Sequence, residues 1–138
     1  MSKKGYKMQK CQFTITTNAD GVENSIRGNG EIMLSLSSAI LRYEEEGTKT
    51  SVTLANGEGQ LERCGAYSLS LPLKEKQTTQ GQIGISGAAG GVEIYTHSLQ
   101  YAIRTDSLLM TAKYDLIFGQ DIQKMQIRIY AKIVKTGE

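Results

Sequence analysis

Apolar and polar residues alternate along almost every segment of this chain, and short turn signals separate the segments. From Gln9 onward, Cys11, Phe13 and Ile15 alternate with polar residues. Successive side chains of a β-strand point to opposite faces, so a period of two predicts strands with one buried face. The pattern predicts an all-β protein.

The turn signals come from fifteen glycines, whereas the chain has only one proline. Asn56-Gly57 is the strongest of them, because Asn-Gly suits the two-residue turn of a β-hairpin. Asn18 to Gly21 and Glu46-Gly47 also predict turns. Gly28-Asn29-Gly30 lies inside a longer segment, Val22 to Leu36, where it indicates a bulge or a sharp bend in a curved strand.

The second half of the chain is harder to divide into strands. Val92 to Thr96 and Leu99 to Ile103 are predicted as two strands around a turn at His97-Ser98, and Lys74 to Gln80 as an exposed loop. Pro72 cannot donate a ladder hydrogen bond, so we expect it at a strand end or on an edge.

The C-terminal region allows two interpretations. Leu108, Leu109, Ala112 and Leu116 fit one face of a helix. The stretch from Met110 to Phe118 nevertheless alternates, and so does the stretch after Gly119. A closing β-hairpin is therefore preferred, with the helix as the alternative.

Eight to ten short strands without a long helix or an internal repeat favour an antiparallel up-and-down β-barrel. A closed barrel also leaves no long sheet edge exposed. The 138 residues predict a single domain over 1–138, with residues 1–7 as a flexible tail.

Composition narrows the expected partners and compartment. A formal net charge of +2, with scattered basic residues, makes a nucleic-acid partner unexpected. The N-terminus lacks the apolar run of a secretory signal, and no segment is long and apolar enough to insert in a membrane, so a cytoplasmic location is expected. Two cysteines and one histidine are too few for a structural zinc site, and no metal or cofactor is expected.

Tyrosines dominate the aromatic residues, with seven Tyr, two Phe and no Trp. A tyrosine combines an apolar ring with a polar tip, which suits a barrel lumen that holds an amphipathic ligand. Tyr43, Tyr67, Tyr101 and Tyr114 are the candidate ligand-binding residues at the lumen or its mouth, together with Arg63.

The three acidic residues Glu44 to Glu46 do not form a catalytic pair, because neighbouring strand residues point to opposite faces. On the inner face Glu45 is expected to meet Arg63, which predicts a structural ion pair at the barrel mouth. Cys64 and His97 are a weak catalytic pair, since His97 is predicted in a turn. Both cysteines are expected to be free and to act as small buried hydrophobes.

The order of several short motifs resembles that of the YwiB-like family of small bacterial proteins of unknown function. The motifs are Tyr43-Glu44-Glu45, Arg63-Cys64-Gly65, Gly91 to Thr96, and Tyr114-Asp115-Leu116. The resemblance runs from about Phe13 to Ile133. It implies a lipocalin-like (calycin) β-barrel and provides no catalytic residues.

With the resemblance added, the expected function is the binding of a small apolar or amphipathic molecule in or at the mouth of the barrel. The alternative is a solidly packed barrel that acts as a protein-interaction or assembly module, with a homodimer as one form of it. No catalytic constellation is present in the sequence, so an enzyme is not expected.

Overall fold

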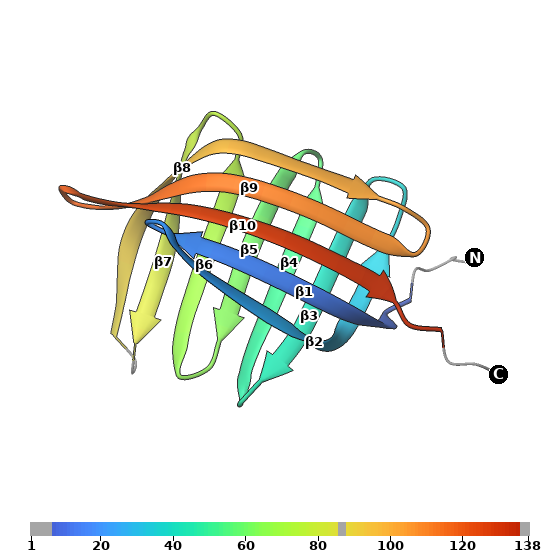
Figure 1. The fold of residues 1–138 in the computed structure, drawn as a ribbon. Helices are drawn as coiled ribbons and strands as arrows, with labels where there is room; N and C mark the ends of the chain where they lie inside the picture. Colours follow the sequence, from blue (N-terminus) through green and yellow to red (C-terminus); the bar gives the residue numbers. More distant parts are fainter. Residues whose placement is uncertain (1–6, 86–87, 136–138) are drawn as a thin grey trace, which may run out of the picture.

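The computed structural model describes residues 7–85 and 88–135, and it confirms the predicted all-β fold. Ten antiparallel strands, joined in up-and-down order, form a closed barrel (Figure 1). The strands are β1 Gln9–Ala19, β2 Val22–Leu34, β3 Ser38–Glu45, β4 Thr48–Ala55, β5 Glu58–Cys64, β6 Tyr67–Lys74, β7 Thr78–Ile85, β8 Ala88–Ile103, β9 Ser107–Phe118 and β10 Asp121–Ile133. Most of the expected N-terminal tail lies outside the described residues.

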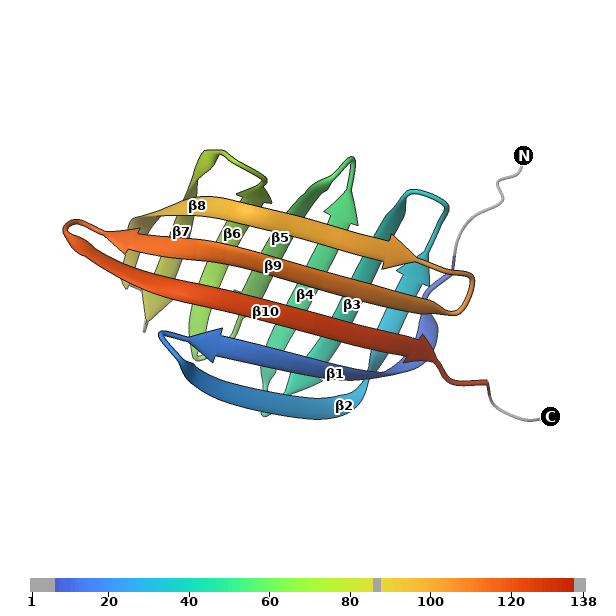
Figure 2. The same cartoon turned by 45° about the horizontal axis from the view of Figure 1, so that its top comes forward.

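The barrel is flattened into two layers whose strands cross (Figures 1 and 2). The long strands β8, β9, β10, β1 and β2 form one layer, and the shorter strands β3 to β7 form the other. We call the end of the barrel with the β1–β2, β3–β4, β5–β6 and β9–β10 turns the cavity end. The opposite end, where Gln9 enters and Ile133 leaves, is the terminal end.

Three two-residue turns explain the hairpins that the sequence predicts. In each of them both residues have positive φ, as a type I′ turn requires. Hairpins favour this turn because its twist matches the twist of the flanking strands. The turns are Asp20-Gly21 (51° and 90°), Glu46-Gly47 (52° and 80°) and Asn56-Gly57 (56° and 76°).

Two glycines lie where a ladder between neighbouring strands ends, Gly30 between β2 and β3 and Gly81 between β6 and β7. A Cβ atom on Gly30 would lie 2.5 Å from the Arg42 carbonyl oxygen, and one on Gly81 would lie 2.5 Å from the Ser70 carbonyl oxygen. Beyond each contact the adjoining ladder stops. The predicted bend at Gly28 to Gly30 is confirmed, but it contains no bulge, since the β1–β2 register is unbroken.

The predicted turn at His97-Ser98 is wrong. β8 runs without a turn from Ala88 to Ile103 and carries a β-bulge between Thr96 and Ser98. The extra residue shifts the alternation by one position, so that Thr96 and Leu99 are both buried. In the sequence, this break in the alternation of apolar and polar residues looks the same as a turn.

Other boundaries differ less. The loop predicted over Lys74 to Gln80 shrinks to residues 75–77, because Thr78 already belongs to β7. Pro72 lies in β6 beyond the last β6–β7 pair, which makes its position a local edge as expected. The C-terminal hairpin β9–β10 is confirmed, and the helix alternative is not realised. Among the described residues, no helix is long and apolar enough to cross a membrane.

Side chains from both layers fill the middle of the barrel and its terminal end. The largest fully buried apolar side chains come from eight strands: Cys11, Ile32, Leu41, Leu54, Leu73, Ile94, Leu108, Met110 and Ile129. Burying each Leu, Ile or Met contributes about 1.5–3 kcal/mol. The cavity end is less completely filled, and the candidate site lies there.

Candidate functional site

A cavity of about 490 Å³ lies inside the barrel at its cavity end. Its floor is apolar and contains Val52, Leu61 and Leu71, all of which are buried. Its mouth contains Val22, which is 72% exposed. Pockets of about 300–1,000 Å³ with apolar walls and a few polar groups are typical of small-molecule sites.

Tyr114 of β9 contributes a polar atom to this apolar cavity. The side chain lines the cavity although the residue is only 3% exposed. Burial raises the pKa of Tyr114 to about 12, so its hydroxyl keeps its proton at neutral pH. Among the described residues the hydroxyl has no hydrogen-bond partner, and it is therefore free to donate to a molecule in the cavity.

Arg63 and Tyr67 form the polar part of the mouth. Arg63 Nη1 donates a hydrogen bond to the Tyr67 hydroxyl oxygen, and its guanidinium carbon lies 5.2 Å from the centre of the Tyr67 ring. This cation–π contact holds a positive charge at the rim, while Tyr67 remains 39% exposed. The arrangement suits the polar head of an amphipathic ligand.

The strand register explains why Arg63 faces the cavity. Tyr43 pairs with Thr50, Thr50 pairs with Arg63, and Arg63 pairs with Leu69. Side chains in one cross-strand row share a face, and this row faces inward. Tyr43 also packs on Phe13 from the opposite layer, with ring centroids 4.4 Å apart.

Four of the five predicted ligand-binding residues line the cavity, and Tyr101 does not. Tyr101 lies at the terminal end, where its hydroxyl oxygen accepts a 2.8 Å hydrogen bond from the Gly57 amide. It ties β8 to the β4–β5 turn. The expected ion pair is also absent: Glu45 and Arg63 both line the cavity, but these two described side chains form no salt bridge, and the hydrogen bond of Arg63 goes to Tyr67.

The sequence interpretation missed the residues that the long strands contribute to the cavity. Ile26 of β2 and Met125 and Ile127 of β10 line it from the layer opposite Arg63. Met125 pairs with Tyr114, so both lie in one inward row. Counting inward positions across a closed barrel from Tyr114 would have identified Met125.

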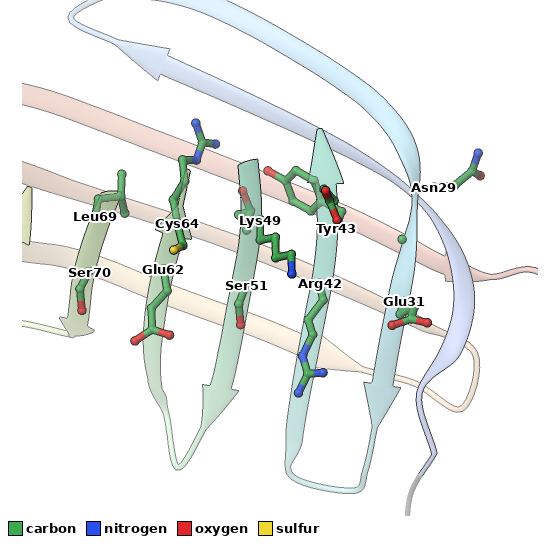
Figure 3. Close-up of a pocket in the computed structure, with 14 residues that line it drawn as sticks. Asn29, Glu31, Arg42, Tyr43, Lys49, Ser51, Glu62, Cys64, Leu69 and Ser70 are labelled. Atoms are coloured by element: carbon green, nitrogen blue, oxygen red, sulfur yellow. The ribbon is translucent and has the colours of Figure 1, made fainter. Parts of the chain in front are cut away.

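A second, larger hollow of about 720 Å³ lies against β2 to β6, and we call it the outer hollow (Figure 3). Outward-facing residues line it together with four residues of the inward row, Tyr43, Thr50, Arg63 and Leu69. One cross-strand row crosses it, formed by Glu31, Arg42, Ser51, Glu62 and Ser70. The row carries two acidic side chains, Glu31 and Glu62, and one basic side chain, Arg42. The hollow has no apolar floor comparable to that of the inner cavity, which makes the inner cavity the stronger candidate.

Cys64 and His97 do not come together. Cys64 lines the outer hollow and is exposed, which corrects the prediction that it is buried. His97 lies on β8, where its Nε2 is 2.9 Å from Asp115 Oδ2 and its ring packs edge-on against Tyr95. The two residues provide no nucleophile and base within reach of each other.

The other cysteine behaves as predicted. Cys11 is buried and free, and burial is the main cause that raises the pKa of its thiol. Within residues 7–85 and 88–135, no three His, Cys, Asp or Glu side chains lie close enough together to share a metal ion.

The fold and the cavity define a closed ten-stranded antiparallel β-barrel with a small chamber at one end. Residues 7–129 match the model of the family described as "Domain of unknown function (DUF1934)", and the chain belongs to this family. The structure is similar to the crystal structure of the YwiB protein from Bacillus subtilis, with a TM-score of 0.79 and 19% sequence identity over 94% of this chain and 96% of that one. The resemblance to the YwiB-like family is thereby confirmed. No curated protein matches the sequence significantly.

Proposed function

We propose that this protein is a lipocalin-like binding protein rather than an enzyme, and that its ligand is a small amphipathic molecule. The observation that carries the proposal is the polarity gradient in the 490 Å³ cavity. Its apolar floor would hold the body of the ligand, and Arg63 with Tyr67 would hold a polar or anionic head at the rim. The Tyr114 hydroxyl, which has no hydrogen-bond partner among the described residues, would donate to an acceptor deeper in the ligand.

The proposal places the protein in the cytoplasm. Cys64 is an exposed free thiol, and such a group stays reduced in a reducing compartment. No part of the binding proposal requires a metal or a cofactor.

Native mass spectrometry of the protein purified from its own cells tests the proposal without a guess about the ligand. We expect an additional mass that disappears on denaturation. A companion titration uses 1-anilinonaphthalene-8-sulfonate, a probe with an apolar body and an anionic head. We expect saturable binding of one probe per barrel.

Variants locate the probe. Arg63→Ala removes the charge at the rim, and we expect about tenfold to a hundredfold weaker binding, the usual value of a charge-assisted hydrogen bond. Arg42→Ala is the matched control, because Arg42 lines the outer hollow and not the inner cavity. Ile26→Trp fills the cavity and should abolish binding, whereas Leu109→Trp, at an exposed position, should not.

A bare mass together with equal effects of Arg63→Ala and Arg42→Ala would refute the proposal. Melting temperatures of all four variants separate a lost site from a lost fold. An unchanged probe affinity with a large loss of stability in Arg63→Ala would assign Arg63 a structural role instead.

A further inference from the structure

Among the described residues, strand β2 has a neighbour on only one side for most of its length. It pairs with β1 from Val22 to Ile32, but with β3 only from Glu31 to Leu34. The segment from Val22 to Gly30 therefore has a free edge, which runs along the side of the long-strand layer (Figure 2). A free edge presents unpaired backbone groups to a further strand.

The β1–β2 turn determines which residues present those groups. In a two-residue hairpin the closing pair, here Ala19 and Val22, is hydrogen-bonded, and every second pair after it is too. The residues between them, Glu23, Ser25 and Arg27, point their amide and carbonyl groups away from β1. The Asp20 amide donates a 2.8 Å hydrogen bond to the Lys124 carbonyl oxygen of β10. It therefore points toward β10 and not toward β2, as this alternation of bonding directions requires.

These three residues are exposed, and the outward backbone groups have no partner within the described part of the chain. Neither Glu23 nor Arg27 has a salt bridge or side-chain hydrogen bond to another described residue. Exposed edges of natural proteins are usually protected by charged side chains, especially lysines, or by prolines, and charges of one sign also repel a second copy of the edge. This edge instead carries one acid and one base, at equal distances on either side of Ser25.

That symmetry makes the edge complementary to itself. A twofold axis through Ser25 places Glu23 opposite Arg27 of a second copy, and Arg27 opposite its Glu23. The three facing pairs provide about six backbone hydrogen bonds, and the two charged pairs lie on one face. Val22 comes opposite Gly28, which has no side chain to obstruct it.

We propose that two copies of this chain form a homodimer by antiparallel pairing of their β2 edges, with the twofold axis at Ser25. The interface is isologous, as in most homodimers. Its charged pairs select the antiparallel register centred on Ser25, because a shift by two residues separates the opposite charges. The inference does not depend on ligand binding in the cavity.

Sedimentation velocity over a wide concentration range tests the dimer. We expect the wild type to dimerise reversibly. Glu23→Arg and Arg27→Glu each place like charges opposite one another, and each should weaken dimerisation about tenfold or more. The double variant Glu23→Arg/Arg27→Glu restores opposite pairs and should recover the wild-type affinity. Both residues are exposed, so the fold tolerates these changes.

Cross-linking tests the register. In a Cys64→Ser background, Ser25→Cys places two thiols across the axis, with Cα atoms about 5.5 Å apart, within disulfide range. We expect a covalent dimer after mild oxidation. Asn29→Cys is the control, since the two copies of this residue lie far apart. A monomeric wild type at every concentration, a dimer insensitive to both charge reversals, or equal cross-linking at the two positions would overturn the proposal.

Discussion

Gly81→Ala tests the claim that the barrel closes through a close approach between backbones at the β6–β7 corner. A Cβ at Gly81 would lie 2.5 Å from the Ser70 carbonyl oxygen and 2.7 Å from Ile94 Cδ1. Ordinary C···O contacts are about 3.3–3.6 Å, so β6 and β7 must move apart at the point where their ladder ends. Such overpacking costs about 1–3 kcal/mol.

The expected loss is measured by chemical unfolding and thermal melting. A destabilisation of about 2 kcal/mol corresponds to a fall of roughly 6–10 °C in Tm for a domain of this size. Gly90→Ala is the matched control on the neighbouring strand β8, because a Cβ there meets nothing within 4 Å. The control should be neutral or more stable by up to about 1 kcal/mol, since alanine restricts the unfolded chain. A Gly81→Ala protein as stable as Gly90→Ala would refute the role of this corner.

Three further predictions concern buried polar groups. The hydroxyl of Thr96 is buried and has no hydrogen-bond partner among the described residues, so Thr96→Val should stabilise the protein by about 1 kcal/mol in urea unfolding. Thr79→Val is the contrasting variant and should destabilise the protein, because the Thr79 hydroxyl donates a hydrogen bond to the Pro72 carbonyl oxygen. Burial raises the pKa of Tyr114 from 10.0 to about 12, so between pH 10 and pH 12 the unfolded chain loses a proton that the folded chain keeps. The free energy of unfolding should therefore fall by about 2–3 kcal/mol from pH 10 to pH 12. Tyr114→Phe should remove this contribution to the pH dependence of the free energy of unfolding. A thiol reagent under native conditions should label Cys64 rapidly and Cys11 only on unfolding, and equal rates would contradict the burial of Cys11.

The inner face of the barrel was largely predictable from residue alternation. Tyr43, Arg63, Tyr67 and Tyr114 were predicted at the lumen, and all four line the cavity. Alternation identifies the face of a strand but not the height of a residue along the barrel. That height depends on the number of turns before the residue, because every turn reverses the chain.

The misplacement of Tyr101 follows from this rule. A turn at His97-Ser98 would have reversed the chain and brought Tyr101 to the same end as Tyr43. The bulge keeps β8 continuous, so Tyr101 lies at the terminal end against Gly57. A bulge and a turn both break the alternation, and only the cross-strand partners distinguish them.

The sequence by itself determined most of the β-strands, the positions of the tight turns and the inward positions, because these depend on local conformation and on a period of two. The tertiary structure alone decided the partner of Arg63, the chamber that remains at one end, and the free edge of β2. Each of these depends on how far two neighbouring strands stay in register before a corner separates them. Gly30 has no side chain, so the β2 backbone can approach the Arg42 carbonyl closely at the corner where the β2–β3 ladder ends. The residues that become neighbours at this corner, Gly30 and Arg42, are distant in sequence.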